Sequence, residues 1–316
     1  MSHFTVLVPA RSYEHLERIL EPYNEQLEDD SPYIEYETDI SPEEVSGVIE
    51  DAWKEIHDRK AFSWLKGNER TDRIAKRIDI LKSENLSAIA HELGWRLGLD
   101  GSFGYYCNPN ARWDWWIVGG RWSGLLKLKD GYANNGLEIG NGEPGVFGGL
   151  NKEQDRADYA PKYAIDWEAM RFERARDHVK MFNKVAAALD KLGYTPQDYM
   201  NNFGLRGTTE DEVEQGRKIH QSIRSAFHEM HGEPLPIFWE FVSADPNKSY
   251  EIKLMEPLTF GIIDLNGKWV TGEEMGWFGV SWEKNEGDID HYHTAYWEII
   301  DKALDDTIFF VVDCHI

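Results

Sequence analysis

A single aromatic segment at residues 104–124, which reads GYYCNPNARWDWWIVGGRWSG, constrains the fold more than any other part of the chain. It holds four tryptophans, two arginines and one aspartate. The Asn-Pro-Asn sequence at residues 108–110 predicts a turn, because proline presets φ and asparagine tolerates left-handed geometry. In the strand predicted at residues 113–118, apolar side chains occur on both alternating faces. We therefore expect this strand to be covered on both sides.

Charged residues within this aromatic segment require partners. Asp114 lies among indole side chains, where an unpaired carboxylate would cost roughly several kcal/mol. We therefore expect it to pair with Arg112, Arg121 or an indole N–H group. Gly119 and Gly120 permit a bulge or a close approach of the backbone to another group.

Two interpretations of this segment stay open at the level of sequence. The first is an aromatic core in which the arginine–aspartate pair is structural, since tryptophan side chains bury large areas. The second is a pocket for a planar or anionic ligand, since arginine beside an aromatic wall can hold a base and a phosphate. The candidate ligand-binding residues are Arg112, Trp113, Asp114, Trp116, Arg121 and Trp122.

Four short blocks of sequence carry a resemblance. They are MSHFTVLV at residues 1–8, NPNARWDWWIVGGRWSG at 108–124, DWEAM at 166–170 and VVDCHI at 311–316. Together they are similar to an uncharacterised protein family common in tailed-phage genomes, whereas about residues 30–100 and 195–250 do not match it. The resemblance implies a phage accessory protein that acts in the cytoplasm of the bacterial host. It brings no assigned activity, so it transfers no catalytic residues.

The charge balance limits the kinds of partner. A formal net charge of −23 argues against direct nucleic-acid binding and against binding to an anionic membrane surface. It leaves open a basic protein partner or mimicry of nucleic acid, and the partner that we expect is a host protein. The acidic residues occur along amphipathic segments instead of one run, which argues against mimicry of nucleic acid. Two cysteines are too few for a disulfide framework, and with no secretory leader or long apolar segment recognised we expect a reduced, cytoplasmic compartment.

Periodicity and capping signals predict the fold class. Strands are expected near both ends, at residues 3–8 and 307–312, and a hairpin partner for the aromatic strand at residues 122–129. The predicted helices span about residues 12–22, 41–57, 166–192, 209–231 and 290–304. This pattern favours an α+β fold with a central, mainly antiparallel sheet that contains both termini as strands, with helices packed on it. We expect one large domain, residues 1–316, with a helical insertion considered at about 153–235.

Catalytic motifs are incomplete in the sequence. His3 and Thr5 fit the His-x-Thr strand motif of two-histidine phosphoesterases, but the second such motif is missing, because only Ile316 follows His315. Cys314 and His315 are adjacent in a strand, so they should point to opposite faces. Histidines near residues 228–231 and 288–293 approach metal-ligand spacing but are typical of solvated helix ends, and no metal or cofactor is expected.

These observations predict a non-catalytic phage accessory protein that binds a host component, for host takeover or counter-defence. The alternative is a protein that binds a small anionic or nucleotide-like ligand, or a phosphoesterase-type enzyme, that uses the tryptophan and arginine pocket. Whether the protein is an enzyme stays open at this level.

Overall fold

The structure of the protein is a computed structural model. It describes residues 3–28, 30–58, 62–132, 155–202, 210–236, 241–275, 281–283, 285 and 287–316. The chain divides into two compact units. Unit 1 comprises Met1–Ile19 and Trp116–Ile316, and unit 2 comprises Leu20–Trp115. Each unit is described by itself.

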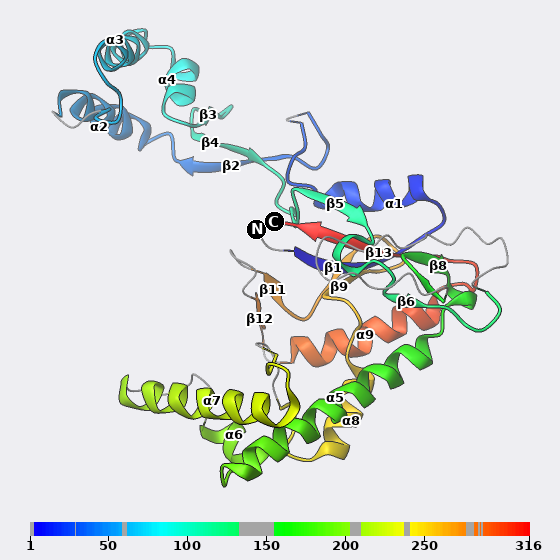
Figure 1. Ribbon diagram of the computed structural model, residues 1–316. Coiled ribbons are helices and arrows are strands. Elements are labelled where there is room, and N and C mark those ends of the chain that lie inside the picture. Colours follow the sequence, from blue (N-terminus) through cyan, green and yellow to red (C-terminus); the bar gives the residue numbers. More distant parts are fainter. Residues whose placement is uncertain are drawn as a thin grey trace. The chain divides into compact units, whose positions relative to one another are not determined.

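The two terminal strands form the centre of unit 1. β1 (His3–Ala10) and β13 (Ile308–His315) pair antiparallel along their whole length, from His3 opposite His315 to Ala10 opposite Ile308. Figure 1 accordingly shows the N and C labels next to each other. The sheet order is β10-β9-β1-β13-β5, with β8 also paired to β13, and only the β1–β9 pair is parallel among the pairings described for it. The predicted α+β fold, with terminal strands in a mainly antiparallel sheet, is confirmed.

The other strands of unit 1 are short. Those of the central sheet are β5 (Trp115–Val118), which begins at the last residue of unit 2, β8 (Tyr159–Pro161), β9 (Gly261–Ile263) and β10 (Trp269–Val270). Two further pairs are β6 (Leu126–Lys127) with β7 (Arg156–Ala157), and β11 (Glu274–Met275) with β12 (Ser281–Trp282).

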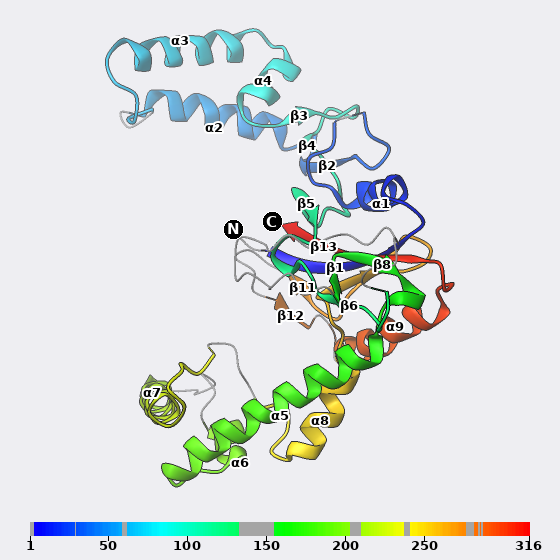
Figure 2. The same cartoon turned by 45° about the vertical axis from the view of Figure 1, so that its right-hand side comes forward.

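Helices cover both faces of the central sheet. α1 (Tyr13–Leu20) lies over one face, and α5 (Trp167–Lys191) and α9 (Asp288–Lys302) lie over the other (Figures 1 and 2). The core under α5 and α9 contains Leu7 and Phe309 from the sheet. Burying such side chains contributes about 1.5–3 kcal/mol each.

The C-terminal half of α5 carries a second core of unit 1. Two helices, α7 (Glu210–His231) and α8 (Pro246–Met255), contact α5. A third helix, α6 (Pro196–Asn202), packs Tyr199 against the same core. The core between α5 and α7 is formed by Phe182, Val185, Leu189, Ile223 and Phe227. These helices belong to unit 1. The single domain of residues 1–316, with a possible helical insertion at about 153–235, stays a prediction.

Unit 2 combines a small sheet with three helices. Its sheet has the order β2-β4-β3, and an apolar core joins the helices to β4. The elements are β2 (Glu35–Ile40), α2 (Val45–His57), α3 (Asn68–Lys82), α4 (Leu86–Glu92), β3 (Arg96–Leu97) and β4 (Phe103–Cys107).

Trp113 is buried in unit 2, where it packs against Tyr23. Its side chain is fully buried and its ring centroid lies 5.5 Å from that of Tyr23. The backbone N–H of Glu25 donates to the Trp113 carbonyl at 2.8 Å. The predicted turn beside it is confirmed, because the Asn110 N–H donates to the Asn108 side-chain oxygen at 2.9 Å.

Two expectations for the aromatic segment are wrong. β5 is not covered on both sides, because Trp115 and Ile117 are 44% and 51% exposed and β5 is at the end of the sheet order. No hairpin forms with residues 122–129 either. Gly119 and Gly120 have positive φ and lead into a 3-10 turn, and β6 then pairs with β7 instead of β5.

Other expectations concern the rest of the chain. The helix predicted at residues 290–304, which should bury Leu304, ends at Lys302 instead, so Leu304 lies beyond α9 and is 72% exposed. The glycine-rich sequence at residues 130–150 also predicts a long irregular loop, and residues 277–282 predict a strand. Most of both segments lies outside the described residues. Within the described ranges, no helix combines the length and apolar character needed to cross a bilayer.

The buried position of Trp113 predicts a large stability effect. Trp113→Ala should lower the free energy of unfolding by about 3–5 kcal/mol, because it removes a buried aromatic side chain and leaves a cavity. Trp64, which is 71% exposed, provides the control, and Trp64→Ala should change stability by less than about 0.5 kcal/mol. Urea unfolding followed by far-ultraviolet circular dichroism measures both. Equal effects of the two substitutions would contradict the structural role of Trp113.

Candidate functional site

The six predicted ligand-binding residues fall on both units. Arg112, Trp113 and Asp114 belong to unit 2, and Trp116, Arg121 and Trp122 belong to unit 1. Arg112 is exposed, and its Nη1 donates to the carbonyl oxygen of Ala111 at 3.0 Å. Trp113 is a core residue of its unit. The common pocket of these residues stays a prediction.

The three members in unit 1 have different surroundings. The ring of Trp116 lies 6.2 Å from that of Tyr13, and Trp122 packs against the core beneath the central sheet. The backbone N–H of Arg121 donates to Oδ2 of Asp313 at 2.9 Å. Arg121 is thus tied to the last strand of the chain, a contact that the sequence analysis did not anticipate.

The two glycines before Arg121 approach two buried carboxyl groups. Gly119 and Gly120 have φ values of +76° and +52°, which side-chain-bearing residues rarely adopt. A Cβ atom on Gly119 would overlap the carboxyl group of Asp158, and one on Gly120 would overlap that of Asp313. The close backbone approach predicted for this pair is therefore confirmed, and both positions require glycine.

Asp158 is held in this loop by two donors. The N–H of Gly124 donates to its Oδ1 at 2.6 Å, and the Ser123 hydroxyl donates to its Oδ2 at 3.3 Å. Burial raises the pKa of Asp158 above its ordinary value, and these two hydrogen bonds oppose that shift. The raised pKa means that the folded state binds a proton at this carboxyl more tightly than the unfolded chain does.

Four polar side chains meet where β1 begins and β13 ends. The register places His3 opposite His315 and Thr5 opposite Asp313, so all four lie on one face of the sheet. Nδ1 of His3 is 2.8 Å from Oδ1 of Asp313, and the two imidazole centroids are 4.9 Å apart at an interplanar angle of 77°. We call these residues the strand-end cluster.

The strand-end cluster is nearly buried. The side chains of His3 and Asp313 are 9% and 2% exposed, and His315 and Thr5 are 6% and 4% exposed. The hydroxyl oxygen of Thr5 accepts from the N–H of Phe260 at 3.3 Å. The His-x-Thr pattern identified His3 and Thr5 and excluded His315, because only Ile316 follows it. The pairing of β1 with β13 nevertheless places His315 opposite His3.

The two cysteines lie outside this cluster. Cys314 is opposite Phe4, on the other face of β13 from His315, so the prediction that Cys314 and His315 point apart is confirmed. Burial raises the pKa of the Cys314 thiol well above its ordinary value. Burial and the Glu37 carboxylate also raise the pKa of Cys107. Neither thiol is therefore prepared as a nucleophile at neutral pH.

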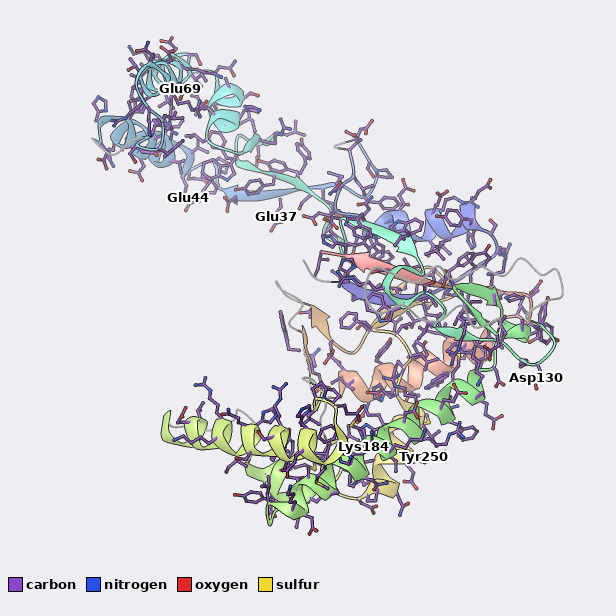
Figure 3. All side chains as sticks on the ribbon, in the orientation of Figure 1. Glu37, Glu44, Glu69, Asp130, Lys184 and Tyr250 are labelled. Atoms are coloured by element: carbon purple, nitrogen blue, oxygen red, sulfur yellow. The ribbon has the colours of Figure 1, made fainter. Side chains whose placement is uncertain are left out.

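Unit 2 presents a second candidate site, an acidic strand face. Glu35, Glu37 and Asp39 alternate along β2 and are exposed, with Glu37 labelled in Figure 3. Tyr105 of β4 lies opposite Glu37 and is 44% exposed. Oδ2 of Asp39 accepts from Nε1 of Trp95 at 2.7 Å. We call these five residues the acidic strand face.

The charge around this face is concentrated in the sequence. Residues 20–58 contain fourteen acidic residues and one basic residue, Lys54. These charges do not form one unbroken acidic run, so the sequence pattern did not single them out. A count of charges in a sliding window would have found them. The alternation of Glu35, Glu37 and Asp39 would then have predicted a single charged face of a strand.

The described residues contain no group of three or more histidine, cysteine or acidic side chains arranged to hold a metal ion. Comparisons of the chain with protein-family models, with curated proteins and with solved structures find no match. Function must therefore be argued from the two candidate sites themselves.

The diglycine contact predicts a stability difference between two glycine positions. Gly120→Ala should lower the free energy of unfolding by more than about 1–2 kcal/mol, because it adds a clash with Asp313 to the cost of a positive φ. Gly193 has a φ of +80° with open space around it, so Gly193→Ala measures the backbone cost alone. Chemical denaturation should rank Gly120→Ala as the more destabilised variant. The reverse ranking would contradict the close approach.

The raised pKa of Asp158 predicts a pH dependence of stability. The protonated carboxyl contributes stability that is fully present below the ordinary pKa of 3.8 and is lost as the pH rises through the raised value. Asp158→Asn removes this titration. The unfolding free energy of the unmodified protein minus that of the variant should therefore fall as the pH rises from about 3.5 to 7. Denaturant titrations across this range measure it, and a difference that rises with pH would refute the buried environment.

Proposed function

We propose that this protein is a phage accessory protein that binds a basic host protein through the acidic strand face. The observation that carries the proposal is the presentation of Glu35, Glu37 and Asp39 side by side on one strand. The resemblance of four sequence blocks to a tailed-phage family supports the biological setting, the bacterial host cytoplasm, and a role in host takeover or counter-defence.

Among the described residues, no basic side chain pairs with the carboxylates of the acidic strand face. Three like charges at alternating strand positions repel one another at modest distance. A partner that brings lysine or arginine side chains to the strand relieves this repulsion, so complex formation is favoured.

The face is also held in place before a partner arrives. β2 and β4 are paired through five residue pairs, and the Asp39 carboxylate accepts from Trp95 and, at 3.4 Å, from the Tyr105 hydroxyl. A group that is already ordered loses less conformational entropy on binding. Tyr105 adds an exposed aromatic surface beside the carboxylates, of the kind enriched in protein interfaces.

The acidity of the chain has a kinetic consequence for such a partner. Complementary charge increases the rate of association. This rate enhancement falls strongly as the ionic strength rises, because exposed charges are screened over about 8–10 Å. The same charge disfavours nucleic acid as the direct partner. A basic protein is therefore the partner class that the face fits best.

A charge-neutralising variant tests this proposal. Glu35→Gln, Glu37→Gln and Asp39→Asn, combined in one protein, should lower capture of the host partner by at least about tenfold, because they remove the complementary charges. The assay is a pull-down from host lysate at low and at moderate salt, with captured proteins identified by mass spectrometry. Capture by the unmodified protein should decrease as salt increases.

A matched variant controls for net charge. Glu251→Gln, Asp301→Asn and Asp306→Asn remove the same charge from exposed positions of unit 1 and should leave capture unchanged. Equal loss in both variants would show that only net charge matters and would contradict the acidic strand face as the binding site. Failure to recover any partner, together with turnover of nucleotides by the purified protein, would contradict the non-catalytic role.

A further inference from the structure

β2 forms one edge of the sheet of unit 2. The sheet order β2-β4-β3 gives β2 a strand neighbour on one side only. Among the described residues, no hydrogen bond joins the backbone of Glu35–Ile40 to any group outside β4. An edge strand presents a row of backbone N–H and C=O groups to which an extended chain can pair. The acidic strand face therefore borders a backbone edge that can itself bind a partner.

The two faces of β2 carry different side chains. Glu35 and Glu37 are exposed on one face. On the other face Tyr36 lies opposite Tyr106, their ring centroids are 5.3 Å apart, and Tyr106 is 44% exposed. Side chains of a strand point to alternate faces. A chain that pairs with β2 therefore meets carboxylates at every second position and an aromatic surface in between.

The length of regular pairing is set by a bulge. The β2–β4 register shifts between Thr38 and Ile40, so Asp39 is an extra residue on β2. The hydroxyl of Tyr36 donates to the carbonyl oxygen of Ser102 at 3.1 Å and holds the strand before the bulge. Residues 35–38 thus form the regular, fixed part of the edge.

Charge decides which chain can pair with this edge. A second copy of β2 would bring carboxylates beside carboxylates, and like charges directly opposite each other destabilise strand pairing. Lysine or arginine at alternate positions would instead lie beside Glu35 and Glu37, with Cβ atoms about 4.5–5.5 Å apart. A helix uses its backbone N–H groups internally, so it cannot pair with the edge.

We propose that β2 binds an extended basic segment of the host partner, which adds to the sheet of unit 2 as a further strand. The segment carries lysine or arginine at alternate positions next to Glu35 and Glu37. The positions between them carry apolar or aromatic residues, which lie next to Tyr36. This inference rests on the proposed function, because it states how a basic partner contacts the acidic strand face.

A peptide of alternating lysine and valine, labelled with fluorescein, tests this pattern on the purified full chain. Fluorescence anisotropy should show binding at least about tenfold tighter than that of a peptide with the same residues in scrambled order. Glu35→Gln and Glu37→Gln, combined in one protein, should remove this preference. Absence of binding by the alternating peptide, or equal binding of the two peptides, would overturn the proposal.

Two N-methylated forms of the peptide separate backbone pairing from attraction of charge. The N–H groups of successive strand residues point to opposite edges, so methylation at every lysine and methylation at every valine block different edges. One form should bind at least about tenfold more weakly, because its hydrogen bonds to β2 are lost, and the other should retain its affinity. Equal affinities of the two forms would overturn strand addition.

Hydrogen–deuterium exchange followed by mass spectrometry locates the added strand. The alternating peptide should slow exchange of the backbone amides of β2. β3, at the other edge of the same sheet, is the control and should be unchanged. Slower exchange at β3 with no change at β2 would overturn the proposal.

Two other results are distinguished from strand addition. A dimer in analytical ultracentrifugation that the peptide dissociates would assign the edge to a second copy of the chain and overturn the proposal. Capture of a host protein that depends on Glu35, Glu37 and Asp39, together with equal binding of the two N-methylated peptides, would overturn strand addition alone and leave the proposed function standing. Capture that does not depend on these three carboxylates would contradict the proposed function itself.

Discussion

The structure of unit 1 depends on the pairing of its first strand with its last. β1 and β13 are neighbours over eight residue pairs, and β9, β5 and β8 are added to one or the other of them. Joining strands that are so far apart in the chain costs loop-closure entropy, which grows only slowly with length. Burial of the central strands on both faces, beneath α1 on one side and α5 and α9 on the other, offsets this cost.

Asp313 links this strand pair to the aromatic segment. One oxygen of its carboxylate contacts His3 on β1, and the other accepts from the Arg121 N–H after the glycine pair. The glycines are required because Asp313 and Asp158 occupy the space that side chains would need. Contacts with buried carboxyl groups thus explain the Gly-Gly-Arg sequence. The same Asp313 carboxylate also holds His3 of the strand-end cluster.

Unit 2 makes a different use of charge. Its acidic residues are concentrated between residues 20 and 58, and three of them alternate on the exposed side of β2. The helices α2, α3 and α4 form an apolar core with Phe103 of β4, and Ile40 at the end of β2 packs against it. The negative charge of unit 2 is thereby concentrated on one exposed strand, whereas unit 1 holds the buried imidazoles.

The sequence by itself determined the features that depend on neighbouring residues. Asp166 caps α5 by accepting from the Ala169 N–H, the Asn-Pro-Asn turn forms as predicted, and strands occupy both ends of the chain. Only the tertiary structure decided that His315 lies beside His3, that β6 pairs with β7, and that Trp113 is a core residue. Capping and turn geometry are set by local hydrogen bonds and backbone preferences, so a few residues suffice to specify them. Strand partners and register are set by burial and pairing between distant segments, which no local pattern encodes.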